Sequence, residues 1–317
     1  MIIVLDPDPP IVVAIMGPTA VGKSAAAHRV ATLLDGEIVS ADSMQVYRGM
    51  DIGTAKPMLD GTIRHHCIDL VDPGKPFSAA MYQQEARQAI QDICNRGRIP
   101  ILVGGTGLYV RAALEDFRFP TGSIDSPSRV ALEADARRLG SLALHERLRR
   151  LDPDSAECIH PNNVRRVIRA LEMAAQGLSY SERHAEFVTP KDIYRALRFG
   201  LSMDRKILYA AIDARVQSML SNGLLDEVKA LVDAGYAEAL TSIQAIGYKE
   251  FLPVLEGTVD LEAASAAVAQ ATRRYAKRQL SWLRGDRRIQ WIEMTDIDVD
   301  ACAHRIVTAV AAARAVL

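Results

Sequence analysis

The stretch IVVAIMGPTAVGKS, residues 11–24, decides the fold. Its first half is a continuous apolar run bounded by prolines and a glycine, which predicts a strand buried on both faces of a parallel sheet. Its second half matches G-x-x-x-x-G-K-[ST], a loop whose backbone N–H groups surround phosphates at the start of a helix. The lysine supplies a cation and the final serine a hydroxyl suited to Mg²⁺. The predicted diphosphate-binding residues are Gly17, Pro18, Thr19, Ala20, Val21, Gly22, Lys23 and Ser24.

Strands and helices alternate after this loop, which is typical of an α/β fold. We predict helices over 24–34 and 78–96 and strands over 37–40 and 99–103, with Ser78 as N-cap and Gly97 just past the helix end. Residues 119–195 are helical and Arg-rich, and strand character resumes over 196–203. The prediction is a P-loop NTPase-like parallel sheet flanked by helices, with an all-helical insertion. The regions are a core of 11–118 and 196–295, the insertion at 119–195 and a C-terminal helix at 296–317.

The composition is that of a globular chain of 317 residues, with 49% hydrophobic and 24% charged residues and a net charge of −1. A basic coat over the whole surface is therefore excluded, although a local basic face is not. The four cysteines are scattered, which indicates a reducing compartment. We expect no signal peptide in residues 1–5, no membrane span and a cytoplasmic protein.

Asp42 lies at the end of the predicted strand over 37–40, after Ala41. In a doubly wound sheet such a carboxylate faces the ligand crevice. It is open to three roles: a helix cap, a Mg²⁺ ligand or a general base. The strand over 99–103 ends in Gly104-Gly105-Thr106-Gly107, where nucleotide hydrolases and kinases usually carry an aspartate for Mg²⁺.

Arg215 lies close to the centre of an apolar helix face when residues 205–222 are placed on a helical wheel. An inward guanidinium needs an anion, because an unpaired buried charge is costly. The partner is either a carboxylate of the core or an anionic ligand. The apolar face comprises Ile207, Leu208, Ala211, Ile212, Val216, Met219 and Leu220.

Two basic clusters stand out in this nearly neutral chain. Residues 273–288 carry seven positive charges and one negative charge, and Arg165, Arg166 and Arg169 form a second cluster in the insertion. Such runs are usually solvated helix faces, but two of them also suit binding of an RNA backbone. Trp282 is open to stacking on a base or to a place in the core, and its spacing favours the core. We interpret His65-His66 as structural, and assign no metal to it.

Four blocks of the sequence together resemble the tRNA dimethylallyltransferase family, and the resemblance runs from about residue 11 to 295. The block DSMQVYRGMDIGTAKP, residues 42–57, is the most specific of them. Asn163 stands where the family usually has Asp, and Ser24 is an accepted variant of Thr. The other strong blocks are 17–24, 104–109 and 246–250, and weaker ones are 65–66, 166–172 and 275–279.

The resemblance implies transfer of a prenyl group from dimethylallyl diphosphate to N6 of adenosine 37 in the anticodon loop of tRNA. It implies that Asp42 is the general base, that Thr106 hydrogen-bonds near the reacting base, and that Arg215 and Mg²⁺, held by Ser24, stabilise the leaving diphosphate. We expect a monomer. The expected tRNA-binding residues are Asp42, Ser43, Met44, Gln45, Thr106, Arg129, Arg165, Arg166, Val167, Ile168, Arg169, Arg274, Lys277 and Arg278.

Three other functions were weighed against this one. A prenyltransferase acting on free AMP, ADP or ATP would share the phosphate loop and Asp42, but would have little use for the basic clusters. A small-molecule kinase is disfavoured by the blocks at 42–57 and 104–109. A non-catalytic RNA-binding module would leave the phosphate loop and the inward Arg215 unexplained.

Overall fold

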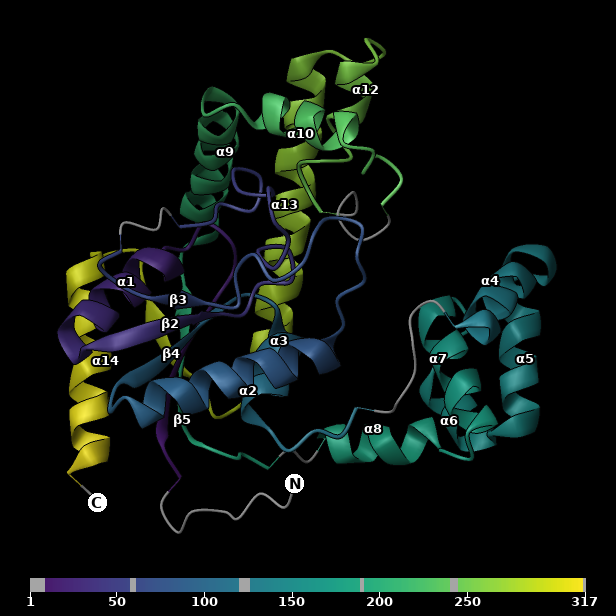
Figure 1. Ribbon diagram of the computed structural model, residues 1–317, viewed down its shortest axis with the longest axis horizontal. Helices are drawn as coiled ribbons and strands as arrows, with labels where there is room; N and C mark the ends of the chain where they lie inside the picture. Colours follow the sequence, from purple (N-terminus) through teal and green to yellow (C-terminus); the bar gives the residue numbers. More distant parts are fainter. Residues whose placement is uncertain (1–8, 58–60, 120–125, 189–190, 240–244, 316–317) are drawn as a thin grey trace. The chain divides into compact units, whose positions relative to one another are not determined.

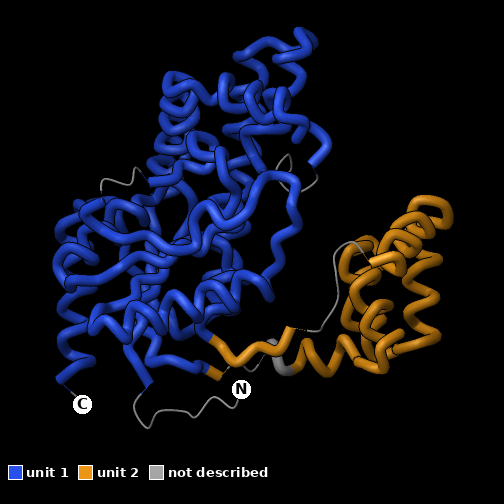
Figure 2. Tube along the Cα trace, in the orientation of Figure 1, with its two compact units in different colours: residues 1–114, 192–317 blue, residues 115–191 orange. Residues whose placement is uncertain are grey.

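The computed structural model describes residues 9–57, 61–119, 126–188, 191–239 and 245–315. The apolar residues 1–5 lie outside this part of the chain. Contacts divide the molecule into unit 1, residues 1–114 and 192–317, and unit 2, residues 115–191 (Figure 2). The bounds of unit 2 thus differ from those of the predicted insertion, residues 119–195, by four residues at each end. No helix in the described ranges is both long and apolar enough to cross a membrane.

Unit 1 is built on a parallel sheet, with the strand order β3-β2-β4-β1-β5-β6 across the described residues (Figure 1). Its strands are β1 (Ile11–Met16), β2 (Gly36–Ser40), β3 (His65–His66), β4 (Ile99–Gly104), β5 (Arg195–Ser202) and β6 (Gln290–Glu293). Its helices are α1 (Lys23–Leu34), α2 (Ala79–Asn95), α3 (Gly107–Leu114), α9 (Arg205–Ser221), α10 (Leu224–Asp233), α12 (Leu252–Leu255), α13 (Leu261–Leu283) and α14 (Val299–Arg314).

Strand β1 lies in the middle of the sheet because its apolar run can be buried on both faces. Val12, Val13, Ala14 and Ile15 are fully buried, and β1 pairs with β4 on one side and β5 on the other. The chain leaves β1 towards β2 and later returns to β5 on the opposite side. Such a reversal opens a crevice at the carboxyl ends of the central strands, where ligands bind in open α/β sheets.

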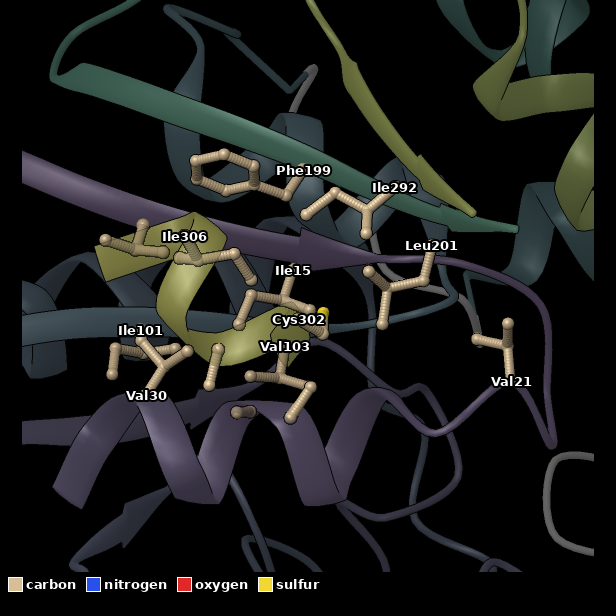
Figure 3. Packing of buried hydrophobic residues seen from close by; sticks show 14 of the residues in the cluster. Ile15, Val21, Val30, Ile101, Val103, Phe199, Leu201, Ile292, Cys302 and Ile306 are labelled. Atoms are coloured by element: carbon tan, nitrogen blue, oxygen red, sulfur yellow. The ribbon is translucent and has the colours of Figure 1, made fainter. Parts of the chain in front are cut away.

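One face of the sheet is covered by α1 and α14, which pack against each other. Figure 3 shows Val30 of α1 with Cys302 and Ile306 of α14 near Val103 of β4, within one buried apolar cluster. The sequence analysis set residues 296–317 apart from the core. The structure places α14 inside unit 1, because its buried side chains complete this cluster. Residues 316–317 lie outside the described part of the chain.

Unit 2 has an apolar core of its own, made by α4 (Pro127–Leu139), α5 (Ser141–Leu151), α6 (Pro153–Cys158), α7 (Val164–Ala175) and α8 (Tyr180–Val188). Helix α7 begins after Asn163, whose side-chain oxygen accepts a hydrogen bond from the Arg166 amide at 3.4 Å. Asn and Asp are both good N-cap residues. The departure from the family pattern at position 163 therefore keeps this capping function.

The strands predicted over 11–16, 37–40, 99–103 and 196–203 are confirmed to within one residue at each end, and Ser78 caps α2 as predicted. Strands β3 and β6 were not predicted. The former is only two residues long, and the latter has a single buried residue, Ile292. His66 lies beside the buried Glu37 of β2, with 2.7 Å between Nε2 and a carboxylate oxygen.

Candidate active site

The phosphate loop turns directly from β1 into α1. Gly22 adopts a left-handed conformation with φ of 94°, and α1 starts at the next residue without a side-chain cap. The amides of its first turn are therefore left for an anion. The Lys23 ammonium lies within the loop and donates to the Pro18 carbonyl at 2.6 Å.

Gln279, on α13, ties the phosphate loop to the turn after β4. Its side-chain oxygen accepts from the Thr19 amide at 3.0 Å, and its amide nitrogen donates to the Gly105 carbonyl at 3.1 Å. The residue is almost fully buried. Gln279 was not predicted as a site residue. No local sequence signal shows that a helix residue 260 positions away contacts the phosphate loop.

Asp42 lies where β2 ends, beside the turn after β4. The Ala41 amide donates to the Val103 carbonyl at 2.7 Å, and the Ser43 amide donates to the Thr106 hydroxyl at 3.2 Å. The Asp42 carboxylate accepts from the Met44 amide at 2.9 Å. These contacts place the predicted base and Thr106 at the ends of the neighbouring strands β2 and β4.

The side chain of Gln45 is used inside the protein. Its oxygen accepts from the Ser40 hydroxyl at 2.8 Å, and its nitrogen donates to the carbonyls of Thr54 and Ala55, both at 3.3 Å. These bonds fold the block 42–57 back on itself. Gln45 therefore shapes the loop that carries Asp42, whatever it also does toward RNA.

The far end of the same block is fixed by a carboxylate of α10. Glu227 accepts from the amides of Asp51 at 2.9 Å, Ile52 at 2.7 Å and Gly53 at 3.1 Å, and from the Tyr248 hydroxyl at 2.6 Å. The two sequence blocks 42–57 and 246–250 are therefore in contact, because Tyr248 of the second block packs directly on Gly53 of the first.

A cavity of about 320 Å³ lies between these loops and helices α9 and α13. Its charged lining includes the cations Lys23, Arg215 and Arg278 and the carboxylate of Asp42. Apolar side chains cover another part of the wall. They include Met44, Val216, Met219, Ile246 and Val268. The cavity therefore offers a positive end for an anion and an apolar region for hydrocarbon.

The electrostatics of the cavity favour a bound anion. Burial and the nearby Arg215 lower the pKa of Lys23 to about 7, against the opposite effect of Asp42. Burial also lowers the pKa of Arg215, and Asp42 opposes that change. Lys23 and Arg215 thus repel each other in a cavity whose described lining contains a single carboxylate, that of Asp42. Arg215 lines the cavity, as its predicted inward position requires. Ile207, assigned to the same apolar face, is 44% exposed, so that assignment is wrong.

The basic residues of α13 and of the segment that follows it fall into two groups. Arg273 binds Asp213 of α9, with 2.6 Å to Oδ2, and Arg288, beyond the helix, pairs with Asp286 at 2.7 Å. These two cations are therefore partly neutralised. By contrast, the side chains of Arg274, Lys277, Arg278, Arg284 and Arg287 are exposed. Tyr275 lines the cavity beneath them and hydrogen-bonds with Thr106.

Two of the predicted RNA-binding residues of unit 2 pair with the nearly buried carboxylate of Glu172 on α7. Arg129 lies 2.9 Å and Arg169 3.4 Å from one of its oxygens. Arg165 and Arg166 are exposed on the same helix. Val167 and Ile168 were also predicted to bind tRNA. Their side chains are buried in the core of unit 2 and are therefore not on its surface.

The family model described as IPP transferase matches residues 45–286. The tRNA dimethylallyltransferase 1 of Pelobacter propionicus is 49% identical over 292 residues, which cover 90% of this chain and 93% of that protein. The tRNA dimethylallyltransferase of Halalkalibacterium halodurans is 48% identical and covers 91% and 92%.

Solved structures give the same result. The full-length tRNA isopentenylpyrophosphate transferase of Bacillus halodurans superposes with a TM-score of 0.71 at 44% identity, covering 96% of each chain. A eukaryotic dimethylallyltransferase acting on tRNA has a TM-score of 0.79 at 31% identity, covering 95% of this chain and 78% of its own. The chain therefore belongs to the IPP transferase family, together with the tRNA dimethylallyltransferases.

Proposed function

We propose that this enzyme transfers the dimethylallyl group of dimethylallyl diphosphate to N6 of adenosine 37 in tRNA and releases diphosphate. One observation carries the assignment: Lys23, Arg215 and the Asp42 carboxylate line one cavity beside the phosphate loop. The cations suit a diphosphate, and the carboxylate suits the proton of an attacking amine. The relatives are named for tRNA, which disfavours a free nucleotide as acceptor.

On the donor side, the allylic C–O bond breaks and its electron pair leaves with the diphosphate. The amides of the loop, the Lys23 ammonium and the Arg215 guanidinium neutralise the charge that grows on the leaving oxygen. Thr19 and Ser24 line the same part of the cavity. The apolar wall that includes Met219 and Val268 offers the prenyl chain a place away from water.

On the acceptor side, N6 of adenine is a poor nucleophile because its lone pair is delocalised into the ring. As the N–C bond forms, one N6 proton passes to the Asp42 carboxylate. General-base help of this kind is typically worth about 10²–10⁴-fold in rate. We assign to Thr106, whose hydroxyl accepts from the Ser43 amide at 3.2 Å, a hydrogen bond with the reacting base.

Mg²⁺ fits the residues of this site. Ser24 offers a hydroxyl oxygen on the cavity wall, and a site of this kind borrows its remaining oxygens from a substrate diphosphate. Ser24 would hold the ion, which would add charge neutralisation at the leaving group.

The tRNA must present an adenine that normally lies stacked in the anticodon loop. Extruding it costs a few kcal/mol, and contacts to the phosphate backbone can offset that cost. We assign these contacts to the exposed Arg274, Lys277 and Arg278 of α13 and to the basic face of unit 2. Since all these groups come from one chain, we expect a monomer, acting in the cytoplasm where tRNA is found.

The test is transfer of labelled dimethylallyl diphosphate, with Mg²⁺, to unmodified tRNA and separately to AMP, ADP and ATP. The proposal predicts label in tRNA alone and none with the Asp42→Ala variant. Label in a free nucleotide would move the enzyme to the rival prenyltransferase class. If neither acceptor were labelled but ATP were consumed, the enzyme would be a kinase.

A further inference from the structure

Trp282 lies near the end of α13 with its ring against the backbone of α3. A Cβ atom added to Gly107, the first residue of α3, would lie only 2.2 Å from Cε3 and 2.3 Å from Cζ3 of the indole. No other residue type at position 107 would allow the ring to lie this close. Even so, 37% of Trp282 is exposed. The sequence-based preference for a core position is therefore wrong, because only part of the ring is covered.

This exposed ring adjoins the catalytic groups through both of its neighbours. Gly107 directly follows Thr106, the residue that holds the Ser43 amide beside Asp42. On α13, Trp282 follows Gln279 and Arg278 by three and four residues, and both of these line the cavity. Residues at these spacings share one helix face. The ring is thus placed one helical turn beyond the cavity lining.

The surroundings of the ring are cationic. Arg274 and Arg278 precede Trp282 at intervals of four residues, and Lys277 and Arg284 are exposed on adjacent turns. An exposed aromatic ring next to a row of cations is the combination with which proteins bind single-stranded RNA: the cations contact phosphates and the ring stacks on a base. Trp291 shares the exposure and the packing on a glycine, so the row of cations on its own helix is what distinguishes Trp282.

We propose that Trp282 is a stacking platform for a nucleobase of the bound tRNA, adjacent to the adenosine that enters the cavity. The inference rests on the proposed function and adds a contact to it. Extrusion of the adenosine removes a stacking partner from the neighbouring base. The indole replaces that partner without reading sequence, because every base has a face that can stack.

Tryptophan fluorescence tests the contact directly. The chain has two tryptophans, and Trp291 of β6 is a matched control: it is 39% exposed and also packs on a glycine, Gly200. We expect a Trp291→Phe protein, which reports Trp282 alone, to lose fluorescence on titration with an unmodified anticodon stem-loop RNA. A Trp282→Phe protein, which reports Trp291 alone, should show no change while it still binds the RNA.

Affinity provides the second measurement. The variant Trp282→Ala should bind the stem-loop about tenfold or more weakly, with kcat at saturating RNA much less affected, whereas Trp282→Phe should stay within a few-fold of wild type. The proposal is overturned if the Trp291→Phe protein binds and prenylates the RNA without quenching of Trp282. If Trp282→Ala does not fold, this quenching still decides. Failure of the wild-type enzyme to prenylate any RNA would instead contradict the proposed function.

Discussion

Replacing Glu227 with alanine should loosen the loop that supports Asp42 without touching the cavity. The Glu227 carboxylate accepts hydrogen bonds from three successive backbone amides, those of residues 51–53, and from the Tyr248 hydroxyl. Residues 54 and 55, which come next, receive the side-chain amide of Gln45. Loss of the carboxylate therefore frees one end of a segment whose other end holds Asp42.

The size of the effect follows from the number of bonds lost. A hydrogen bond to a charged acceptor is worth about 1.5–3 kcal/mol when shielded and nearer 1 kcal/mol when water can replace it. Glu227 is half-buried, so we take about 1 kcal/mol for each of its bonds and allow for some replacement by water. The local opening free energy of the loop should fall by about 3 kcal/mol.

Hydrogen exchange of the amides of residues 51–53 is the assay. A loss of about 3 kcal/mol predicts exchange about 100-fold faster than in wild type, together with a lower kcat for prenyl transfer. The neighbouring variant Asp226→Ala is the control, because it removes an exposed carboxylate from the same helix turn and should change neither quantity. Unchanged exchange and unchanged kcat in Glu227→Ala would refute the reasoning.

Two further substitutions test strands β4 and β2, which lead into the site. Gly104→Ala would place Cβ 2.1 Å from the Ala41 carbonyl oxygen. We therefore expect a loss of about 1–3 kcal/mol in the free energy of urea unfolding, and a reduced kcat. Wild-type values of both quantities would show that this close approach is not required. Burial raises the pKa of Glu37, but hydrogen bonds from Arg96 and His66 outweigh it, and the net pKa is lowered. Because Arg96 is partly exposed, Glu37→Gln should cost only about 1–2 kcal/mol at neutral pH. The wild type should lose this stabilisation only as the pH falls through the lowered pKa of Glu37, and an identical acid profile of the two proteins would argue against the pairing.

The central strands and the phosphate loop could be predicted because their signals are local. A continuous apolar run such as 11–16, or a Ser cap before 79–95, specifies its element without reference to the rest of the chain. Edge strands β3 and β6 carry no such signal, because they exist only through pairing with β2 and β5.

Long-range partners account for the errors in the site. Arg273 was predicted as part of a basic cluster, yet its guanidinium is bound by Asp213, 60 positions earlier in the chain. Gln279 was missed, and Trp282 was placed in the core, because helical periodicity gives a direction but not the neighbour that lies there. Arg215 was placed correctly since its apolar flanks fix that direction, and the shared cavity then supplies the reason for its charge.

The central claim is that the Asp42 carboxylate removes the N6 proton during prenyl transfer to tRNA. Single-turnover transfer by Asp42→Asn tests it most directly, with the affinities for the stem-loop RNA and for dimethylallyl diphosphate measured on the same protein. The account predicts a rate lower by about 10²–10⁴-fold and affinities within a few-fold of wild type. A wild-type rate, or a loss explained wholly by weaker binding, would contradict it.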